Sequence, residues 1–198
     1  LRTLDFSAGM NISGQGTHML DYAMSLNEDA RVLRVFGAAS GTEGMVGIHP
    51  APDSSVGQVL FANGVYGVWN NGPTAPRAGD ESTVWQHCRV AAYAEQGHTL
   101  WEEFGKWEIV SPDGTEEGRI ADMQDWEAGN HAAQAALVNA MFDWIENEDH
   151  PAGTNLELGL HQWEAVLALY ASALWRRSVE LPFEPPEDLF LKLAEALS

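Results

Sequence analysis

The sequence has one cysteine, few basic residues and no long hydrophobic run. Cys88 is the only cysteine among 198 residues, so no internal disulfide is possible and a cytoplasmic, reducing location is expected. No apolar run reaches the roughly 18 to 20 residues that a membrane span needs. The formal net charge of −19 would repel phosphate backbones and anionic lipid. We therefore expect no nucleic-acid partner and no membrane partner.

Motifs that hold common cofactors are also missing. There is no GxGxxG after a strand and no P-loop lysine motif, which excludes a recognisable cradle for nucleotide phosphates. The seven histidines are scattered without HxxxH or HExxH spacing, so no metal site is expected. Glu157 and His161 share a helix face at a spacing that permits metal binding, but a surface pair is the commoner meaning.

The composition is that of a folded domain. Apolar residues make up 45% of the chain, which is long enough to bury a real core. We expect residues 1–198 to form a single domain in which residues 183–198 are a C-terminal helical tail. The chain starts in a strand-like segment without an initiator methionine, and we expect it to be a fragment of a longer protein.

Hydrophobic periodicity predicts strands followed by helices. Helical spacing predicts helices over 17–26, 125–146, 156–175 and 187–197. Trp144 and Trp163 fall in the apolar stripes of two of these helices and are expected in the core. Alternating and β-branched segments predict strands over 1–6, 31–39, 56–61, 65–69, 87–94, 98–104 and 107–110. Hairpin turns such as Asn63-Gly64 join most of them, so the sheet is expected to be antiparallel.

The stretch from Asn11 to Leu26 carries the candidate site. A tight turn with two glycines leads into an apolar-faced helix, on which His18 and Asp21 are three residues apart and therefore neighbours. A histidine beside a carboxylate at a helix start can serve as an acid or base. The alternative is a helix N-terminus whose His18 and Asp21 only satisfy local hydrogen bonds, and spacing alone favours it.

Three further residues are candidates for substrate contact or support. Asn11 and Gln15 lie in or next to the turn and carry neutral hydrogen-bonding groups. Trp69 lies near a strand end and is followed by Asn70 and Asn71, and an indole can stack on the C–H face of a sugar.

Four segments, taken in order, resemble the C-terminal domain of the glucose-fructose oxidoreductase / inositol 2-dehydrogenase (Gfo/Idh/MocA) family. Residues 14–21 (GQGTHMLD) are similar to the family's Gly-x-His-x-x-Asp turn and helix. Residues 59–67 (VLFANGVYG) are similar to its F-x-N-G-V-x-G hairpin, and residues 160–173 and 177–182 to its late helix and the following strand. The order and spacing of the four segments, rather than any one of them, make the resemblance specific.

The resemblance implies an α+β fold with an open, predominantly antiparallel β-sheet and helices packed on one face. It also implies a missing N-terminal Rossmann domain that holds NAD or NADP. His18 would face the nicotinamide and the substrate hydroxyl as the catalytic acid or base, and Asp21 would fix the helix or the imidazole. The full-length protein would then be an NAD(P)-dependent oxidoreductase acting on a sugar, cyclitol or related polyol. This chain alone would be inactive and would contain no cofactor-binding residue.

One departure from the family pattern supports an alternative function. Many family dehydrogenases have an aspartate four residues before the histidine, and that position is Gly14 here. Gln15 could bind a sugar hydroxyl but cannot hold a proton. The alternative is a non-catalytic sugar-binding or dimerisation module without redox activity.

Association of the chain with itself is also expected. The strands near 87–110 carry large residues on both faces, more than the solvent face of a monomer would present. These residues are Trp85, Val90, Tyr93, Leu100, Trp101, Phe104 and Trp107. A homo-oligomer formed through the sheet is the prediction.

Overall fold

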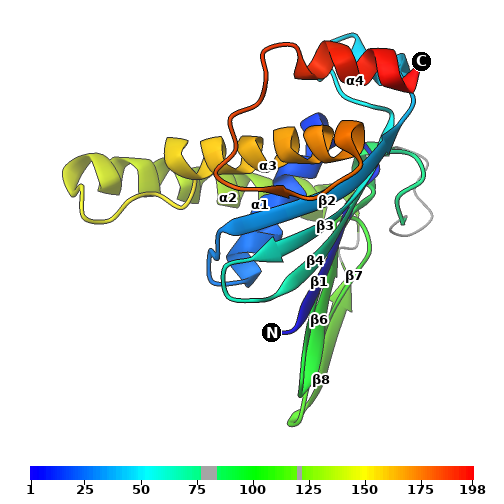
Figure 1. Ribbon diagram of the computed structural model, residues 1–198. Helices are drawn as coiled ribbons and strands as arrows, with labels where there is room; N and C mark the ends of the chain where they lie inside the picture. Colours follow the sequence, from blue (N-terminus) through cyan, green and yellow to red (C-terminus); the bar gives the residue numbers. More distant parts are fainter. Residues whose placement is uncertain (77–83, 120–121) are drawn as a thin grey trace.

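Nine strands form one open sheet in the computed structural model, which describes residues 1–76, 84–119 and 122–198. The order across the sheet is β8-β7-β6-β5-β1-β4-β3-β2-β9. The described neighbours are antiparallel except β1 and β4, which run in the same direction. The helices lie on one side of the sheet (Figure 1). The predicted α+β class with a predominantly antiparallel sheet is confirmed.

Strands β1 to β7 follow the predicted segments to within a few residues, β9 lies in the strand that the resemblance implied over 177–182, and β8 was not predicted. Their bounds are Thr3–Ala8 (β1), Val32–Ser40 (β2), Ser54–Phe61 (β3), Tyr66–Asn71 (β4), Cys88–Ala94 (β5), Gly97–Glu102 (β6), Lys106–Ser111 (β7), Gly114–Arg119 (β8) and Val179–Glu180 (β9). Gly64 at the β3–β4 turn has a positive φ of 84°, which only glycine adopts without strain.

Four α-helices and three short helical turns complete the described chain. The helices are Thr17–Leu26 (α1), Met123–Glu146 (α2), Leu156–Trp175 (α3) and Leu189–Leu197 (α4). The turns are Ile12–Gly16 (η1), Glu43–Met45 (η2) and Val84–Gln86 (η3). Helices α1 and α3 begin and end where the sequence predicted.

The core lies between the sheet and the helices α1 and α3. Phe6 of β1 and Leu20 of α1 are both fully buried in it. Gly37 of β2 pairs with Gly57 of β3, and a Cβ on either would lie 2.8 Å from the side chain of Leu169 in α3. The two glycines therefore let α3 approach the sheet closely. Leu193 of α4 is buried as well, so the C-terminal helix packs onto this core.

Helix α2 and the first half of α3 expose their apolar stripes. None of the residues of α2 is buried, and Phe142 and Ile145 are 60% and 73% exposed. In α3, Leu160 is 61% exposed and Trp163 44%. Trp144 is only partly buried, so the prediction that Trp144 and Trp163 are core residues is wrong. The spacing identified the stripes, but no described element of the chain covers them.

No helix in the described ranges combines the length and the apolar character that crossing a bilayer requires.

A partly buried histidine joins α3 to β2. The Nε2 atom of His161 accepts a hydrogen bond from the backbone N–H of Val32 at 2.9 Å, so this nitrogen carries no proton and the ring is neutral. Its Nδ1 atom lies 3.6 Å from Oε2 of Glu164. Burial, assisted by the positive charge of Arg31, lowers the pKa of His161, although Glu164 raises it.

We expect His161→Gln to make the fold less sensitive to acid. Because the folded-state pKa is lowered, only the unfolded chain binds this proton as pH falls below about 6.5. The free energy of unfolding therefore falls between that pH and the lowered folded value. A glutamine oxygen can accept the Val32 N–H without titrating.

Urea denaturation at pH 7.5 and 5.5 measures the effect. The wild type should lose more free energy of unfolding between the two pH values than the variant does. His131→Gln, on the exposed surface of α2, is the control and should behave as wild type. An equal loss in His161→Gln and wild type would contradict the prediction.

Candidate functional site

The side chain of Asn11 organises the turn that precedes α1. Its Oδ1 atom accepts the backbone N–H of Gly14 at 2.9 Å, and its Nδ2 atom donates to the carbonyl oxygen of His49 at 2.9 Å. Its own carbonyl accepts the N–H groups of Gly14, Gln15 and Gly16 at 3.2, 3.2 and 3.4 Å, which closes the π-helical turn η1. Asn11 is therefore placed as a supporting residue.

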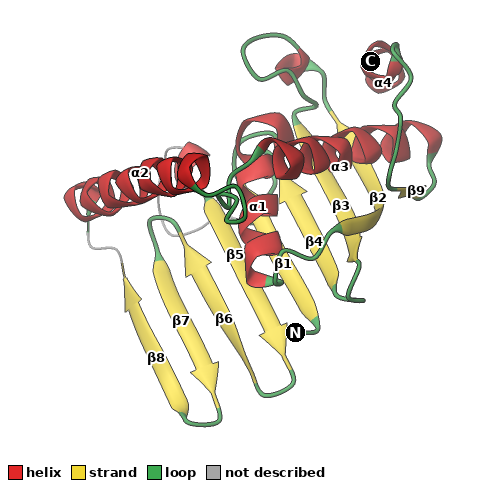
Figure 2. Cartoon of the chain, turned by 90° about the vertical axis from the view of Figure 1, so that its left-hand side faces the viewer, coloured by secondary structure: helices red, strands yellow, loops and turns green. Residues whose placement is uncertain are grey.

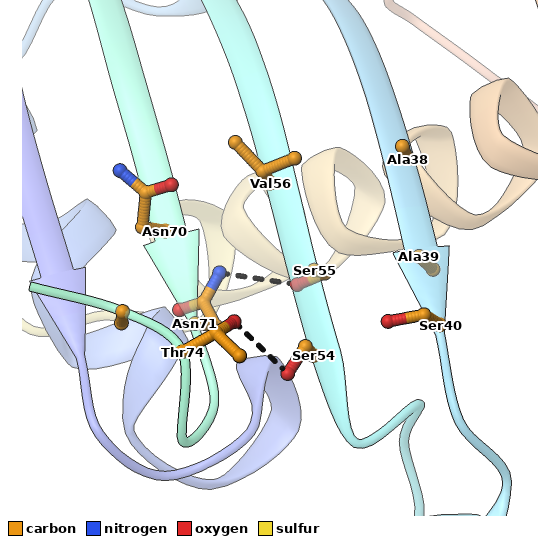
Figure 3. Close-up of a pocket in the computed structure, with 10 residues that line it drawn as sticks. Ala38, Ala39, Ser40, Ser54, Ser55, Val56, Asn70, Asn71 and Thr74 are labelled. Carbon is orange, nitrogen blue, oxygen red and sulfur yellow. Dashed lines mark hydrogen bonds between the residues drawn. The ribbon is translucent and has the colours of Figure 1, made fainter.

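Gly16 fixes where this turn meets the sheet. Any Cβ at this position would collide with the side chain of Asn71, at the end of β4. The Nδ2 atom of Asn71 in turn donates to Oγ of Ser55 at 3.2 Å, as Figure 3 shows. Because β1 and β4 are parallel, both end beside η1, and the turn packs onto this end of the sheet.

Gln15 ties the turn to η3. Its Nε2 atom donates to the carbonyl oxygen of Trp85 at 2.6 Å. Its Oε1 atom is buried and has no hydrogen-bond partner in the part of the chain that the structure describes. Gln15 is thus half-buried, and its buried acceptor lacks a partner among the described residues.

His18 is exposed in the first turn of α1, although the next two residues, Met19 and Leu20, are buried. The helix buries its apolar stripe against β1 and β5, and this directs His18 away from the interior. Tyr22, one turn further on, has its ring 5.3 Å from that of Trp101 in β6.

Asp21 supports the helix. Its Oδ1 atom accepts a hydrogen bond from Nε2 of Gln162 at 2.5 Å, which joins α1 to α3. Asp21 was expected to fix either the helix or the imidazole, and this contact supports the first of these roles.

Trp69 lies in the core. It is 0% exposed, and its ring stacks on that of Phe6 in β1 with centroids 5.8 Å apart. The structure therefore does not bring Trp69 to a surface with His18, and its proposed ligand contact has no support in the geometry. Alternation along β4 turns it toward the helices with Asn71.

Sequence reasoning missed Glu103, which follows β6 and lies near the start of α1. Its Oε1 atom accepts the indole N–H of Trp126 at 3.2 Å. Burial raises the pKa of Glu103, against hydrogen bonds from Cys88 and Trp126 and the charge of His18, which lower it. Burial and the charge of Glu103 raise the pKa of the Cys88 thiol, so Cys88 stays protonated. No spacing rule links positions 18 and 103.

A separate pocket lies at the end of β2, β3 and β4. Its volume is about 190 Å³, and none of its lining residues is charged. Figure 3 shows Ser54, Ser55, Asn70, Asn71 and Thr74 around it. None of the predicted site residues lines this pocket, and it offers no group that could exchange a proton. The described residues also contain no cluster of three potential metal ligands.

Neither a family model nor a curated protein matches this sequence, but solved structures match the fold. An oxidoreductase from Agrobacterium radiobacter, in complex with NAD⁺, L-tartaric acid and magnesium, has a TM-score of 0.65 at 16% identity and matches 90% of this chain and 55% of its own. Aldose-aldose oxidoreductase from Caulobacter crescentus, complexed with glycerol, has a TM-score of 0.63 at 14% identity. The match covers 91% of this chain and 55% of that one. UDP-N-acetylglucosamine 3-dehydrogenase from Acidithiobacillus ferrooxidans has a TM-score of 0.57 at 13% identity. The match covers 86% of this chain and 53% of that one.

These neighbours are oxidoreductases or dehydrogenases, and this chain shares the fold of one part of each of them. The chain has the fold of the C-terminal domain of Gfo/Idh/MocA-type oxidoreductases, as the resemblance predicted. It spans about half the length of the solved structures that it matches.

We expect Asn11→Ala to lower the free energy of unfolding by about 1 to 2 kcal/mol, because the cap of η1 is lost. Asn11→Asp keeps the acceptor for the Gly14 N–H but loses the donor to His49, so its loss should be smaller. Asn139→Ala, on the exposed surface of α2, is the control and should have no destabilising effect. Urea denaturation measures all three variants. Equal losses for Asn11→Asp and Asn11→Ala would contradict the capping role.

Proposed function

We propose that this chain is the substrate-binding and oligomerisation domain of an NAD(P)-dependent oxidoreductase that acts on a sugar, cyclitol or related polyol by hydride transfer. The observation that carries the proposal is the exposed imidazole of His18, held at the start of α1 by the Asn11 turn. Solved neighbours with this fold include oxidoreductases complexed with NAD⁺ or with glycerol, which supports both halves of the proposal.

The residues of this chain would handle the proton of the reaction. Oxidation of a carbinol releases a hydride from carbon and a proton from oxygen, and a bound nicotinamide supplies the hydride acceptor. His18 accepts the hydroxyl proton at an imidazole nitrogen, and in the reverse reaction returns it. Gln15, whose half-buried amide lies in the turn before His18, would orient a neighbouring hydroxyl group.

The described residues fit one side of a cofactor site. They include no glycine-rich turn for a pyrophosphate, and the net charge of −19 opposes binding of a dinucleotide by this chain alone. An N-terminal Rossmann domain is therefore the proposed partner that holds NAD or NADP. The exposed stripes of α2 and α3, which include Phe142 and Leu160, support a further covering partner of this kind.

The charge also bears on the substrate and the location. An acidic domain disfavours an anionic substrate, so a neutral polyol fits this surface better. The lone thiol, Cys88, is buried and unpaired, which fits the proposed reducing cytoplasm.

We expect His18→Ala to lower kcat by about two to four orders of magnitude, the contribution of a positioned acid or base. The measurement is dinucleotide reduction with a panel of neutral polyols, in the protein that carries this chain. His150→Ala, an exposed loop position, should retain activity. Near-wild-type rates for His18→Ala would reduce His18 to a residue of the helix start. Tight NAD(P) binding by the 198 residues alone would contradict the proposal that a separate Rossmann domain holds the cofactor.

We further propose a homo-oligomer formed through the open face of the sheet. Phe36, Val56, Tyr66 and Val68 of β2, β3 and β4 are 43 to 50% exposed on this face. The large residues that led to the prediction lie partly elsewhere. Val90 and Phe104 are 4% and 7% exposed, and Trp101 contacts Tyr22 under α1. The four most exposed of these side chains on the open face are therefore those of β2–β4, while Tyr93 in the predicted range is 38% exposed.

Replacing Phe36 and Val68 together by glutamate should yield a monomer, because each new carboxylate would be desolvated in the interface. Light scattering at micromolar concentration measures the mass of the wild type and the variant. Ile48→Glu, at a loop position that is 92% exposed, should leave the assembly unchanged. A monomeric wild type would contradict this proposal.

A further inference from the structure

The directions of α1 and β6 determine which of their residues face each other. Strands β1 and β6 each pair antiparallel with β5, so they run in the same direction. The chain turns back at η1, and α1 therefore runs against both strands, as Figure 2 shows. A step toward the start of α1 is a step toward the end of β6.

One ring contact then fixes the register between the two elements. Tyr22 of α1 packs on Trp101 of β6 at 5.3 Å. One helical turn back from Tyr22, about 6 Å along the axis, is His18. Glu103 lies two residues beyond Trp101, in the turn that directly follows β6. Burial raises the pKa of the Glu103 carboxyl, and the charge of His18 partly opposes this rise.

Contacts on three sides hold Glu103 in this place. Its backbone N–H donates to the carbonyl oxygen of Cys88 at 3.0 Å, and its Oε1 accepts the indole N–H of Trp126 at 3.2 Å. Trp126 is itself packed against Phe104 and Trp85, with ring centroids 5.5 and 5.7 Å away. The carboxylate is thus hydrogen-bonded to Trp126, and the packing of that ring against Phe104 and Trp85 limits its movement.

We propose that Glu103 is the positioning residue that pairs with His18 and stabilises its protonated ring. The proposal rests on the proposed function, in which His18 takes the proton from a substrate hydroxyl. The proton forms an N–H bond on the imidazole as the O–H bond breaks, and the charge that develops on the ring faces the Glu103 carboxylate. The ring later releases the proton to water. From the turn after β6, Glu103 supplies the carboxylate that Gly14 cannot provide.

The environment of Glu103 indicates that stability does not explain its presence. The groups that face it are His18 and Tyr22 of α1, Cys88 of β5 and Trp126 of α2. Since its folded-state pKa is raised, folding weakens as pH rises from about 4.3, the ordinary value of Glu, through the raised value. At neutral pH a charged Glu103 therefore destabilises the fold, as functional groups commonly do.

Site-resolved modification of histidines by diethyl pyrocarbonate tests the pair without any cofactor or substrate. The reagent attacks the neutral imidazole, so a neighbouring carboxylate that favours the protonated ring slows the reaction. In Glu103→Gln, which keeps an acceptor for Trp126, modification of His18 at pH 6 should be about two- to tenfold faster. His98 and Glu108, whose Nε2 and Oε1 atoms are 3.0 Å apart, give the matched pair. Glu108→Gln should accelerate His98 and leave His18 unchanged.

Two outcomes would overturn the proposal. One is an unchanged His18 rate in Glu103→Gln in the same experiment in which His98 responds to Glu108→Gln. The other is a lower melting temperature of Glu103→Gln at pH 7, because a structural carboxylate would stabilise the fold, whereas we expect the melting temperature to rise.

Kinetics then separate this inference from the proposed function. If the protein oxidises polyols, Glu103→Gln should lower kcat by about one to two orders of magnitude, less than His18→Ala does. Glu103→Asp should restore part of this activity. If no dinucleotide is reduced by the wild type, the proposed function fails, while the modification rates still decide whether Glu103 and His18 form a pair.

Discussion

The parallel pairing of β1 with β4 is the constraint on which the candidate site depends. It ends two neighbouring strands at the same edge of the sheet, and the chain must turn there before α1 can cover the core. The Asn11 side chain closes that turn, and only a glycine at position 16 fits against Asn71. His18 follows two residues later, so its exposed position is a consequence of how the turn packs on the sheet. In the proposed function, placement by backbone contacts would reduce the entropy that the imidazole loses when it engages a substrate.

Two surfaces of the domain are more apolar than a free surface normally is. The stripes of α2 and of the first half of α3 expose Phe142, Ile145 and Leu160, and the open face of the sheet exposes Phe36 and Val68. Large exposed apolar areas usually mark association sites. Their placement on opposite sides of the sheet is compatible with one neighbour at the helices and another at the strands. The chain spans about half the length of its solved neighbours.

Two polar groups near the start of α1 are buried without full hydrogen bonding or at a cost in desolvation. Gln15 has a buried oxygen without a partner in the described ranges, and burial raises the pKa of Glu103. A fold selected for stability alone would satisfy or replace such groups. Fixed contacts to Trp85 and Trp126 hold the two groups, whereas the pocket at the end of β2–β4 has no charged lining residue.

The sequence by itself determined the local features of this protein. Periodicity located α1 and α3 and the strands, and hairpin turns such as Asn63-Gly64 predicted an antiparallel sheet. The tertiary structure decided burial and long-range proximity. It placed Trp69 in the core, left Trp163 exposed and brought the Trp126 indole to the Glu103 carboxylate. The physical reason is that periodicity encodes which face of an element is apolar, whereas the direction and register in which elements pack decide which faces meet.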